Sequence, residues 1–297
     1  MQPKPPAPVC YRHPDRPTGL ACTRCGRPAC PECLTPAAVG QHCVVCVQQG
    51  RNDVRPVRNI AGTDVSRQIP VPYVTYALIA INVIVFAITA FQAQSLAHND
   101  FSRLFQRWEM VPVQVGNGQW ERVIGSGFLH YGPIHLLANM FALYMLGPYC
   151  EVALGRARYL AVYLVSLLGG SAAVIAFYGA QSHSAGASGA IFGIFGAVAV
   201  IMLRTRQNLT QIMVLLVINL VITFAVPGIS IWAHLGGLVC GTAATAGILY
   251  LPRWVGARDT RVALNIGWAA VAALGIAAIL VTVLTAPSGV VLPYIPA

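Results

Sequence analysis

A serine between small residues lies where a polar stretch of the chain meets a long apolar run. Residues 184–193 read SAGASGAIFG, and the sequence then stays apolar as far as Leu203. The hydroxyl of Ser188 could act as a nucleophile, because a helix N-terminus stabilises negative charge and offers backbone N–H groups. Close helix packing is the alternative, since small residues let membrane helices approach each other. A nucleophilic serine also needs a base, so the other polar residues in apolar runs decide between these readings.

Three further polar residues lie inside apolar runs. His234 lies about one turn into one run, and His135 and Asn139 form an i, i+4 pair on one face of another. Histidine in hydrocarbon usually marks function, although a hydrogen bond between helices is the structural alternative. His234 could remove the serine proton, while His135, Asn139 and the backbone N–H of Ser188 could stabilise an oxyanion. The apolar runs offer no acidic residue to orient His234, so we expect a dyad, with the ring of Phe192 packed on the imidazole.

The elements that must position these residues are membrane helices. The chain has 297 residues, of which 56% are hydrophobic and 9% charged, whereas soluble domains carry about 25% charge. Apolar runs of about 17–25 residues can span a bilayer as helices. We therefore predict an all-α polytopic membrane protein with seven such helices: Tyr73–Ala93, Ile134–Tyr149, Tyr159–Tyr178, Ala187–Leu203, Leu209–Val226, Ser230–Leu251 and Val262–Ala286.

Glycines in two of these runs predict a close helix crossing. Gly237 and Gly241 form a Gly-x3-Gly face in the sixth run, and the fourth run carries Gly189, Gly193 and Gly196. Residues without bulk let two backbones meet. We expect the fourth and sixth helices to pack together, which would bring His234 towards Ser188.

Arginines alternate between the connections and predict the topology. They precede the first run and recur in every second connection, as Arg156 and Arg158, then Arg204 and Arg206, then Arg253, Arg258 and Arg261. The positive-inside rule places these connections, and so the N-terminus, in the cytoplasm, and the C-terminus outside. Ser188, His234, His135 and Asn139 then share the outer half of the membrane. The net charge of +10 follows this topology, so we expect a multi-pass plasma-membrane protein and no nucleic-acid partner.

Seven cysteines and one histidine near the N-terminus have the spacing of metal ligands. They form four pairs with two-residue gaps, enough for two tetrahedral zinc ions; the ligands are Cys10, His13, Cys22, Cys25, Cys30, Cys33, Cys43 and Cys46. The segment is too short to bury a core, so metal would have to fold it. A disulfide knot is the alternative, but it needs an oxidising compartment. His42, beside Cys43, could replace a ligand.

The cysteine module resembles B-box and RING-like fingers. This resemblance implies a cross-braced pairing, in which the first ligand pair joins the third and the second joins the fourth. The spacing itself leaves a consecutive pairing open. Such a module would bind a cytoplasmic protein partner or regulate the membrane part.

The membrane part resembles rhomboid intramembrane serine proteases over roughly Pro72 to Leu251. Three motifs carry the resemblance, in the family's order: FLHYGPIHLLANMFALYMLG, GASGAIFG and AHLGGLVCG. The residue triplet Trp120-Glu121-Arg122 fits the spaced form of a family motif in the first loop, while Phe192 stands where many members have tyrosine. The resemblance implies a six-helix core with a water-filled cavity open to the outside, here with a seventh C-terminal helix.

The resemblance also implies an activity and residue roles. Ser188 would be the nucleophile and His234 its base, with the oxyanion and supporting positions at His135, Asn139, His130 and Gly186. Rhomboids cleave single-pass membrane proteins near the outer end of their transmembrane segment, in the lipid bilayer and without a cofactor. A non-catalytic protein that binds client transmembrane helices is the alternative function. A third reading makes the zinc module the main function and the helices its anchor.

These inferences divide the chain into six parts. We predict a disordered tail at 1–9, a zinc-binding module at 10–46, a linker at 47–71, a rhomboid six-helix catalytic core at 72–251, a cytoplasmic loop with the seventh transmembrane helix at 252–286, and an extracytoplasmic tail at 287–297.

Overall fold

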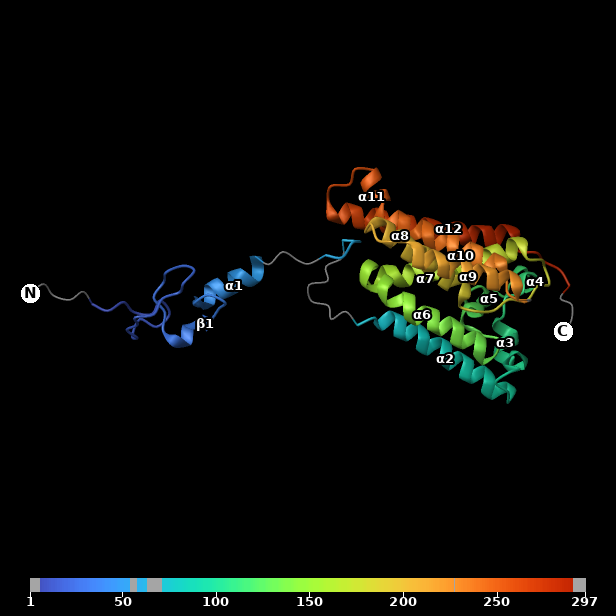
Figure 1. The fold of residues 1–297 in the computed structure, drawn as a ribbon, viewed down its shortest axis with the longest axis horizontal. Helices are drawn as coiled ribbons and strands as arrows, with labels where there is room; N and C mark the ends of the chain where they lie inside the picture. The colour runs from blue at the N-terminus through green and yellow to red at the C-terminus, as the bar shows by residue number, and fades with distance from the viewer. Residues whose placement is uncertain (1–5, 54–57, 63–70, 227, 291–297) are drawn as a thin grey trace, which may run out of the picture. The chain divides into compact units, whose positions relative to one another are not determined.

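The computed structural model describes residues 6–53, 58–62, 71–226 and 228–290, which form two compact units, Met1–Val57 and Arg58–Ala297 (Figure 1). Parts of the predicted tails and linker, at 1–5, 54–57, 63–70 and 291–297, lie outside the described residues. The six-part division therefore stays a prediction.

The first unit is a small module whose interior consists largely of cysteine side chains. A short 3-10 helix, η1 (Pro31–Cys33), leads into strand β1 (Leu34–Pro36), which pairs antiparallel with β2 (Gln41–Cys43). Helix α1 (Val44–Asp53) follows and continues seven residues beyond Cys46, into the stretch where the sequence predicts a linker. The buried thiols take the place that aliphatic side chains hold in a larger domain, as expected of a module this short.

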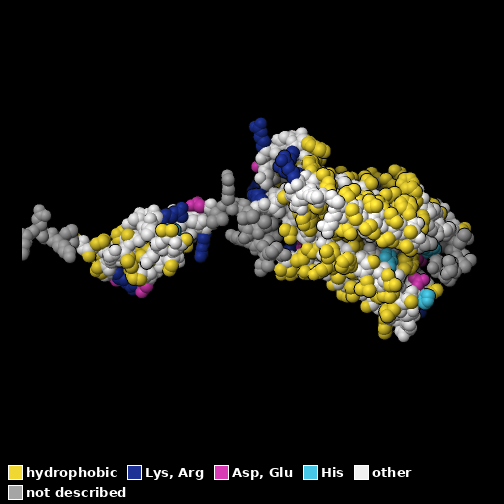
Figure 2. All heavy atoms as spheres, in the orientation of Figure 1, with side chains coloured by type: hydrophobic (Ala, Val, Ile, Leu, Met, Phe, Trp, Pro, Cys, Tyr) yellow, Lys and Arg dark blue, Asp and Glu magenta, His cyan; other side chains and the backbone are white. Residues whose placement is uncertain are grey.

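The second unit is a bundle of apolar helices. All seven predicted runs are helical, and among the described residues five helices are long and apolar enough to cross a membrane. Large apolar side chains cover much of the surface in view (Figure 2), as lipid contact requires. The predicted fold class, a mostly helical polytopic membrane protein, is confirmed. The seven helices are α2 (Tyr73–Ala93), α6 (Gly132–Leu154), α7 (Arg156–Phe177), α8 (Ser188–Arg204), α9 (Thr210–Ala225), α10 (Ile231–Leu249) and α12 (Thr260–Thr285).

Helix α8 lies at the centre of the bundle and is short. It packs against both α7 and α10, which also contact each other, with α2 and α6 towards one side of the bundle and α12 towards the other (Figure 1). Its 17 residues span about 25 Å, whereas the hydrocarbon core of a bilayer is about 30 Å thick. A helix of this length can end below the membrane surface, so Ser188, its first residue, can lie within the membrane.

The crossing of α8 and α10 depends on glycine. A methyl group added at Gly237 would overlap the carbonyl oxygen of Gly189, and one added at Gly241 would overlap the backbone of Gly193. The two backbones are therefore in direct contact, as the Gly-x3-Gly spacing predicts. This contact fixes the separation of the helices that carry Ser188 and His234.

The connection from α2 to α6 is more ordered than the sequence indicates. Five short helices occupy it where we predicted a loop, because helices of three to six residues leave no readable periodicity. The buried guanidinium of Arg122 ties this segment together, donating to the carbonyl of Glu109 at 2.7 Å and to Gln119 Oε1 at 2.8 Å. The elements are η2 (Asn99–Phe101), α3 (Arg103–Trp108), α4 (Pro112–Gly116), α5 (Glu121–Gly125) and η3 (Ser126–Phe128).

The opposite end of the bundle is held by a buried carboxylate. Glu151, near the end of α6, accepts from the backbone N–H groups of Val74 and Thr75 at 3.0 and 2.8 Å and from the Thr75 hydroxyl at 2.9 Å. A negative charge at the N-terminus of α2 is favourable because the first N–H groups of a helix have no helical partner. Gly155, at φ +85°, then lets the chain pass directly into α7.

Candidate functional site

Ser188 stands at the first position of α8, after a loop that is fastened on both sides. Met110 and Ser184 exchange backbone hydrogen bonds of 2.9 and 3.0 Å, and the N–H of Gly186 donates to the carbonyl of Ser126 at 2.9 Å. Ala187 is fully buried. The loop is therefore pinned to the ordered connection before α6, and the serine hydroxyl stands at the half-buried start of a buried helix.

The base predicted from the sequence lies within hydrogen-bond distance of this hydroxyl. His234 Nε2 is 2.7 Å from Ser188 Oγ. His234 occupies the first turn of α10, whose N-terminus is capped by Ser230 through a 3.3 Å bond to the N–H of Ala233. The ring of Phe192 stacks on the imidazole with centroids 4.0 Å apart and planes 12° from parallel, so the expected packing is present. Helices α8 and α10 together place a hydroxyl, a base and an aromatic support in contact.

The second imidazole nitrogen has a partner that the sequence did not reveal. Thr223 Oγ1, on α9, lies 2.7 Å from His234 Nδ1 and also 2.8 Å from the carbonyl oxygen of Asn219. A threonine in an apolar helix commonly bonds to the carbonyl four residues earlier. Nothing in the sequence therefore distinguishes Thr223 from any other threonine of these helices.

His135 carries its ring proton on the nitrogen that borders the space over Gly186. The N–H of Tyr131 lies 3.3 Å from His135 Nδ1, and because an N–H can only donate, this nitrogen must be the acceptor. The proton of the neutral ring then lies on Nε2. A Cβ built on Gly186 would lie 2.9 Å from that Nε2 and 3.6 Å from Ser188 Oγ. The missing side chain of Gly186 leaves a small space bordered by the imidazole N–H and the serine hydroxyl.

The two remaining predicted support residues lie behind His135. Asn139, one turn further along α6, donates from Nδ2 to the carbonyl of His135 at 3.2 Å. His130 is fully buried, with its ring edge-on to that of His135 and the centroids 5.1 Å apart. Burial lowers the pKa of His130 to about 3, so the ring is neutral. His183, the loop histidine nearest to Ser188 in sequence, pairs with Glu109 at 3.1 Å.

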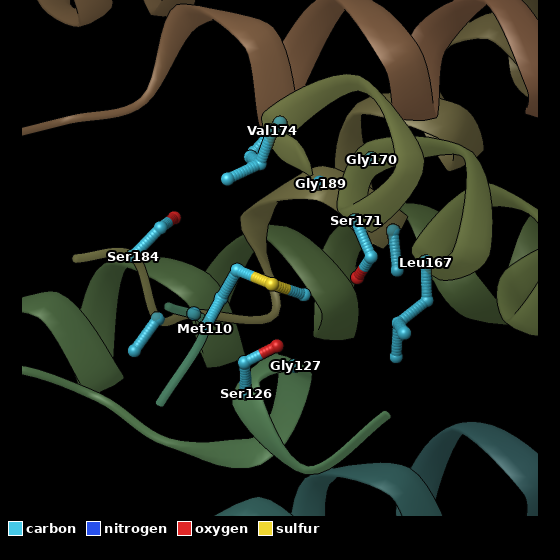
Figure 3. Close-up of a pocket in the computed structure, with 13 residues that line it drawn as sticks. Met110, Ser126, Gly127, Leu167, Gly170, Ser171, Val174, Ser184 and Gly189 are labelled. Atoms are coloured by element: carbon cyan, nitrogen blue, oxygen red, sulfur yellow. The ribbon is translucent and has the colours of Figure 1, made fainter. Parts of the chain in front are cut away.

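A small pocket opens beside the serine. Figure 3 shows the apolar side chains of Met110, Leu167 and Val174 and the hydroxyls of Ser126, Ser171 and Ser184 around it. Glycines, among them Gly127, Gly170 and Gly189, contribute backbone to its lining. Gly186 and Gly189, which flank Ser188 in the sequence, both line the pocket, so it adjoins the backbone on either side of the serine.

In the first unit the ligand pairs form two clusters with the cross-braced pairing. One cluster contains Cys10, His13, Cys30 and Cys33, the other Cys22, Cys25, Cys43 and Cys46, with the ligand atoms of each within 4.8 Å of one another. His42, on β2, belongs to neither cluster. Both clusters could hold a metal ion.

Distances within the clusters match a tetrahedral metal site. A zinc tetrahedron separates two sulfurs by about 3.8 Å, and sulfur from nitrogen by about 3.6 Å. Cys25 Sγ and Cys43 Sγ are 3.7 Å apart, and His13 Nδ1 is 3.4 Å from the sulfurs of both Cys30 and Cys33. Against the effect of burial, backbone N–H groups, foremost that of Cys30, lower the pKa of Cys10 to about 6, whereas burial and neighbouring thiols raise the pKa of Cys33 to about 11. The sulfur and nitrogen ligand types and their separations suit a metal that binds thiolate and imidazole.

Comparison with known proteins links the helical unit to one family. Residues 117–251 match the family model described as Rhomboid domain. Rhomboid protease GluP of Bacillus subtilis (strain 168) is 34% identical over 182 residues, covering 60% of this chain but 35% of GluP. Putative rhomboid protease YdcA of the same organism is 36% identical over 132 residues, or 43% of this chain and 66% of YdcA. RHOMBOID-like protein 5 of Arabidopsis thaliana is 30% identical over 209 residues, which cover 58% of this chain and 67% of that protein.

Proposed function

The chain belongs to the rhomboid family, and on that premise we propose that it is an intramembrane serine endopeptidase with Ser188 and His234 as its catalytic dyad. The observation that carries the proposal is the 2.7 Å approach of His234 Nε2 to Ser188 Oγ at the start of a central, buried helix. Relatives whose names describe them as rhomboid proteases support the same activity.

The proposed reaction follows from the donors and acceptors around the hydroxyl. His234 Nε2 takes the Ser188 proton as Oγ attacks a peptide carbonyl, and it then returns the proton to the leaving amine. The carbonyl oxygen becomes an oxyanion in the space over Gly186, next to His135 Nε2–H and the backbone N–H of Ser188. Water, activated by the same imidazole, releases the acyl group and regenerates the serine.

The proposed substrate is a single-pass transmembrane segment in the lipid bilayer. A helical segment hides its carbonyls in backbone hydrogen bonds, so it must unwind before attack. Glycine, serine or proline near the site of cleavage should favour this step, because they weaken a helix. Alanine does not weaken a helix, but its side chain is small enough to suit a site lined by several glycines and alanines. We place the protein in the plasma membrane with its arginine-rich connections in the cytoplasm. The dyad would then lie in the outer half of the membrane.

Mapping a covalent adduct tests the proposal. Purified full-length protein in detergent is incubated with a fluorophosphonate, and digested peptides are searched for the modified residue by mass spectrometry. We expect a single adduct, on Ser188, and cleavage of a transmembrane substrate reconstituted in liposomes. A folded protein that binds a transmembrane peptide without forming an adduct or cleaving would support the alternative function, binding of client helices.

Gly186→Ala is expected to lower kcat by about 10²–10³-fold, the effect of removing one oxyanion donor. The new methyl group would lie 2.8–2.9 Å from the ring of His135 and displace it from the oxyanion space. Gly179→Ala is the matched control, because Gly179 lies in the same α7–α8 loop, also has positive φ, and has open space around its Cβ position. Cleavage rates of the two variants, measured beside wild type, check this; equal rates would contradict the assignment of the oxyanion space.

We further propose that both cysteine clusters bind zinc and that the module recruits a cytoplasmic protein or regulates the protease. Metal analysis of purified full-length protein should find two zinc ions per chain. Cys22→Ser should lose one ion, because it removes a ligand from one cluster only. His42→Ala should keep both ions, and loss of metal in this variant would mean that the ligand set is different.

A further inference from the structure

Among the described residues, three side chains make a hydrogen bond or a ring contact with that of His234, and they come from two other helices. Ser188 and Phe192 belong to α8, and Thr223 belongs to α9. The aromatic ring restricts the plane of the imidazole, but a stacked ring does not select which nitrogen carries the proton. That choice falls to the hydrogen bond at Nδ1.

The hydrogen bonds of Thr223 decide the tautomer. Its hydroxyl has one proton, and the carbonyl of Asn219, 2.8 Å away, can only accept it. When the proton goes to that carbonyl, a lone pair of Oγ1 remains for His234 Nδ1 at 2.7 Å, and Nδ1 donates; this is the one arrangement in which both contacts are hydrogen bonds. With the proton on Nδ1, Nε2 has a free lone pair directed at Ser188. The resulting chain of hydrogen bonds leads from His234 Nδ1–H to Thr223 Oγ1 and from the Thr223 hydroxyl to the carbonyl of Asn219.

We infer that Thr223 is a positioning residue of the active site, occupying the place that a carboxylate holds in a serine protease triad. This inference rests on the proposed Ser188–His234 dyad. Thr223 holds the imidazole in the tautomer that can accept the serine proton, and its oxygen continues to accept from Nδ1–H when the ring becomes positively charged. A neutral hydroxyl suits this setting, since a buried carboxylate would need further partners to offset its desolvation.

The placement of Thr223 supports a specific rather than a general packing role. Thr223 is 4% exposed, whereas its neighbours Ile222 and Phe224 are 47% and 76% exposed. Helix α9 thus turns a single polar side chain towards the bundle at this level. The Thr223 hydroxyl could have made only the hydrogen bond to the carbonyl of Asn219, as other helical threonines do. It also lies within hydrogen-bond distance of the imidazole.

The test uses the rate of fluorophosphonate labelling as a function of probe concentration in full-length protein. Thr223→Val removes the hydroxyl with little change of shape and should lower the maximal labelling rate by about tenfold or more, with little change in the half-saturating concentration. Thr223→Ser restores the hydroxyl and should recover most of the rate. Thr282→Val is the matched control, since Thr282 is buried on α12 and makes the same bond to a carbonyl four residues earlier, at 3.0 Å.

The outcomes separate this inference from the proposed function. Wild-type labelling that is lost in Ser188→Ala but unchanged in Thr223→Val would overturn the positioning role and leave the dyad intact. Failure of Thr223→Ser to recover the rate would also overturn it, because shape rather than hydroxyl would then matter. An unlabelled wild type would overturn both. If Thr223→Val lowers the melting temperature of the protein, Thr223→Cys takes its place. A thiol accepts hydrogen bonds only weakly, so this variant should also lower the maximal labelling rate.

Discussion

Ser188→Ala is expected to abolish cleavage, lowering kcat by at least about 10³-fold, and His234→Ala to cost nearly as much. The two side chains form one unit, because the hydroxyl is a poor nucleophile without the base and the base has no other proton to take. The double variant should therefore be no slower than either single variant. Cleavage of a reconstituted transmembrane substrate, measured for wild type and the three variants, checks this expectation.

Two matched substitutions show whether the loss is specific. Ser182→Ala changes a serine in the same loop whose hydroxyl donates to the carbonyl of Gly179 at 2.8 Å, away from the pocket. His98→Ala changes a histidine whose ring meets Phe101 in the connection before α6. Both variants should cleave at nearly the wild-type rate. Activity that survives Ser188→Ala would place the nucleophile elsewhere, and multiplicative losses in the double variant would mean that the residues act independently.

Much of the helical unit could be predicted because the deciding information is local in sequence. Long apolar runs must form helices in lipid, since backbone groups there have no other partners. Gly237 and Gly241 indicated a backbone contact, and motifs at helix starts indicated which side chains would meet. The pairing of the cysteine clusters needed a resemblance, because four ligand pairs can be joined two by two in three ways and spacing alone does not choose among them.

The rest depended on contacts between segments that no sequence pattern encodes. The tautomer of His135 follows from the N–H of Tyr131, whose position is set by the ordered connection before α6. Thr223 makes the same local bond as other helical threonines, and only the approach of α10 gives it a second partner. Helix α1 continues past Cys46 although its sequence has no marked apolar face. Sequence pattern and composition do not predict the structure at such positions, because the local conformation and hydrogen bonds depend on tertiary neighbours.

Gly237→Ala is expected to destabilise the helical unit by about 3 kcal/mol or more and to remove most activity. The added methyl group would overlap the carbonyl oxygen of Gly189, and neither group is a flexible side chain that could turn away. The helices must separate, and α10 carries His234 with it. A displacement of about 1 Å at a reacting group can cost about 100-fold in rate, so activity should fall even in the fraction that remains folded.

Gly275→Ala separates this effect from the general consequence of replacing a membrane glycine. Gly275 lies on α12, where a new Cβ would meet Val165 Cγ2 at 3.6 Å, an ordinary contact. Alanine there should change stability by at most about 1 kcal/mol, in the stabilising direction, because it favours the helix. Thermal unfolding in detergent and the rate of fluorophosphonate labelling compare the two variants. If Gly237→Ala unfolds at the wild-type temperature and labels at the wild-type rate, the helices can adjust without moving the imidazole, and the Gly189–Gly237 contact does not set the distance between Ser188 and His234.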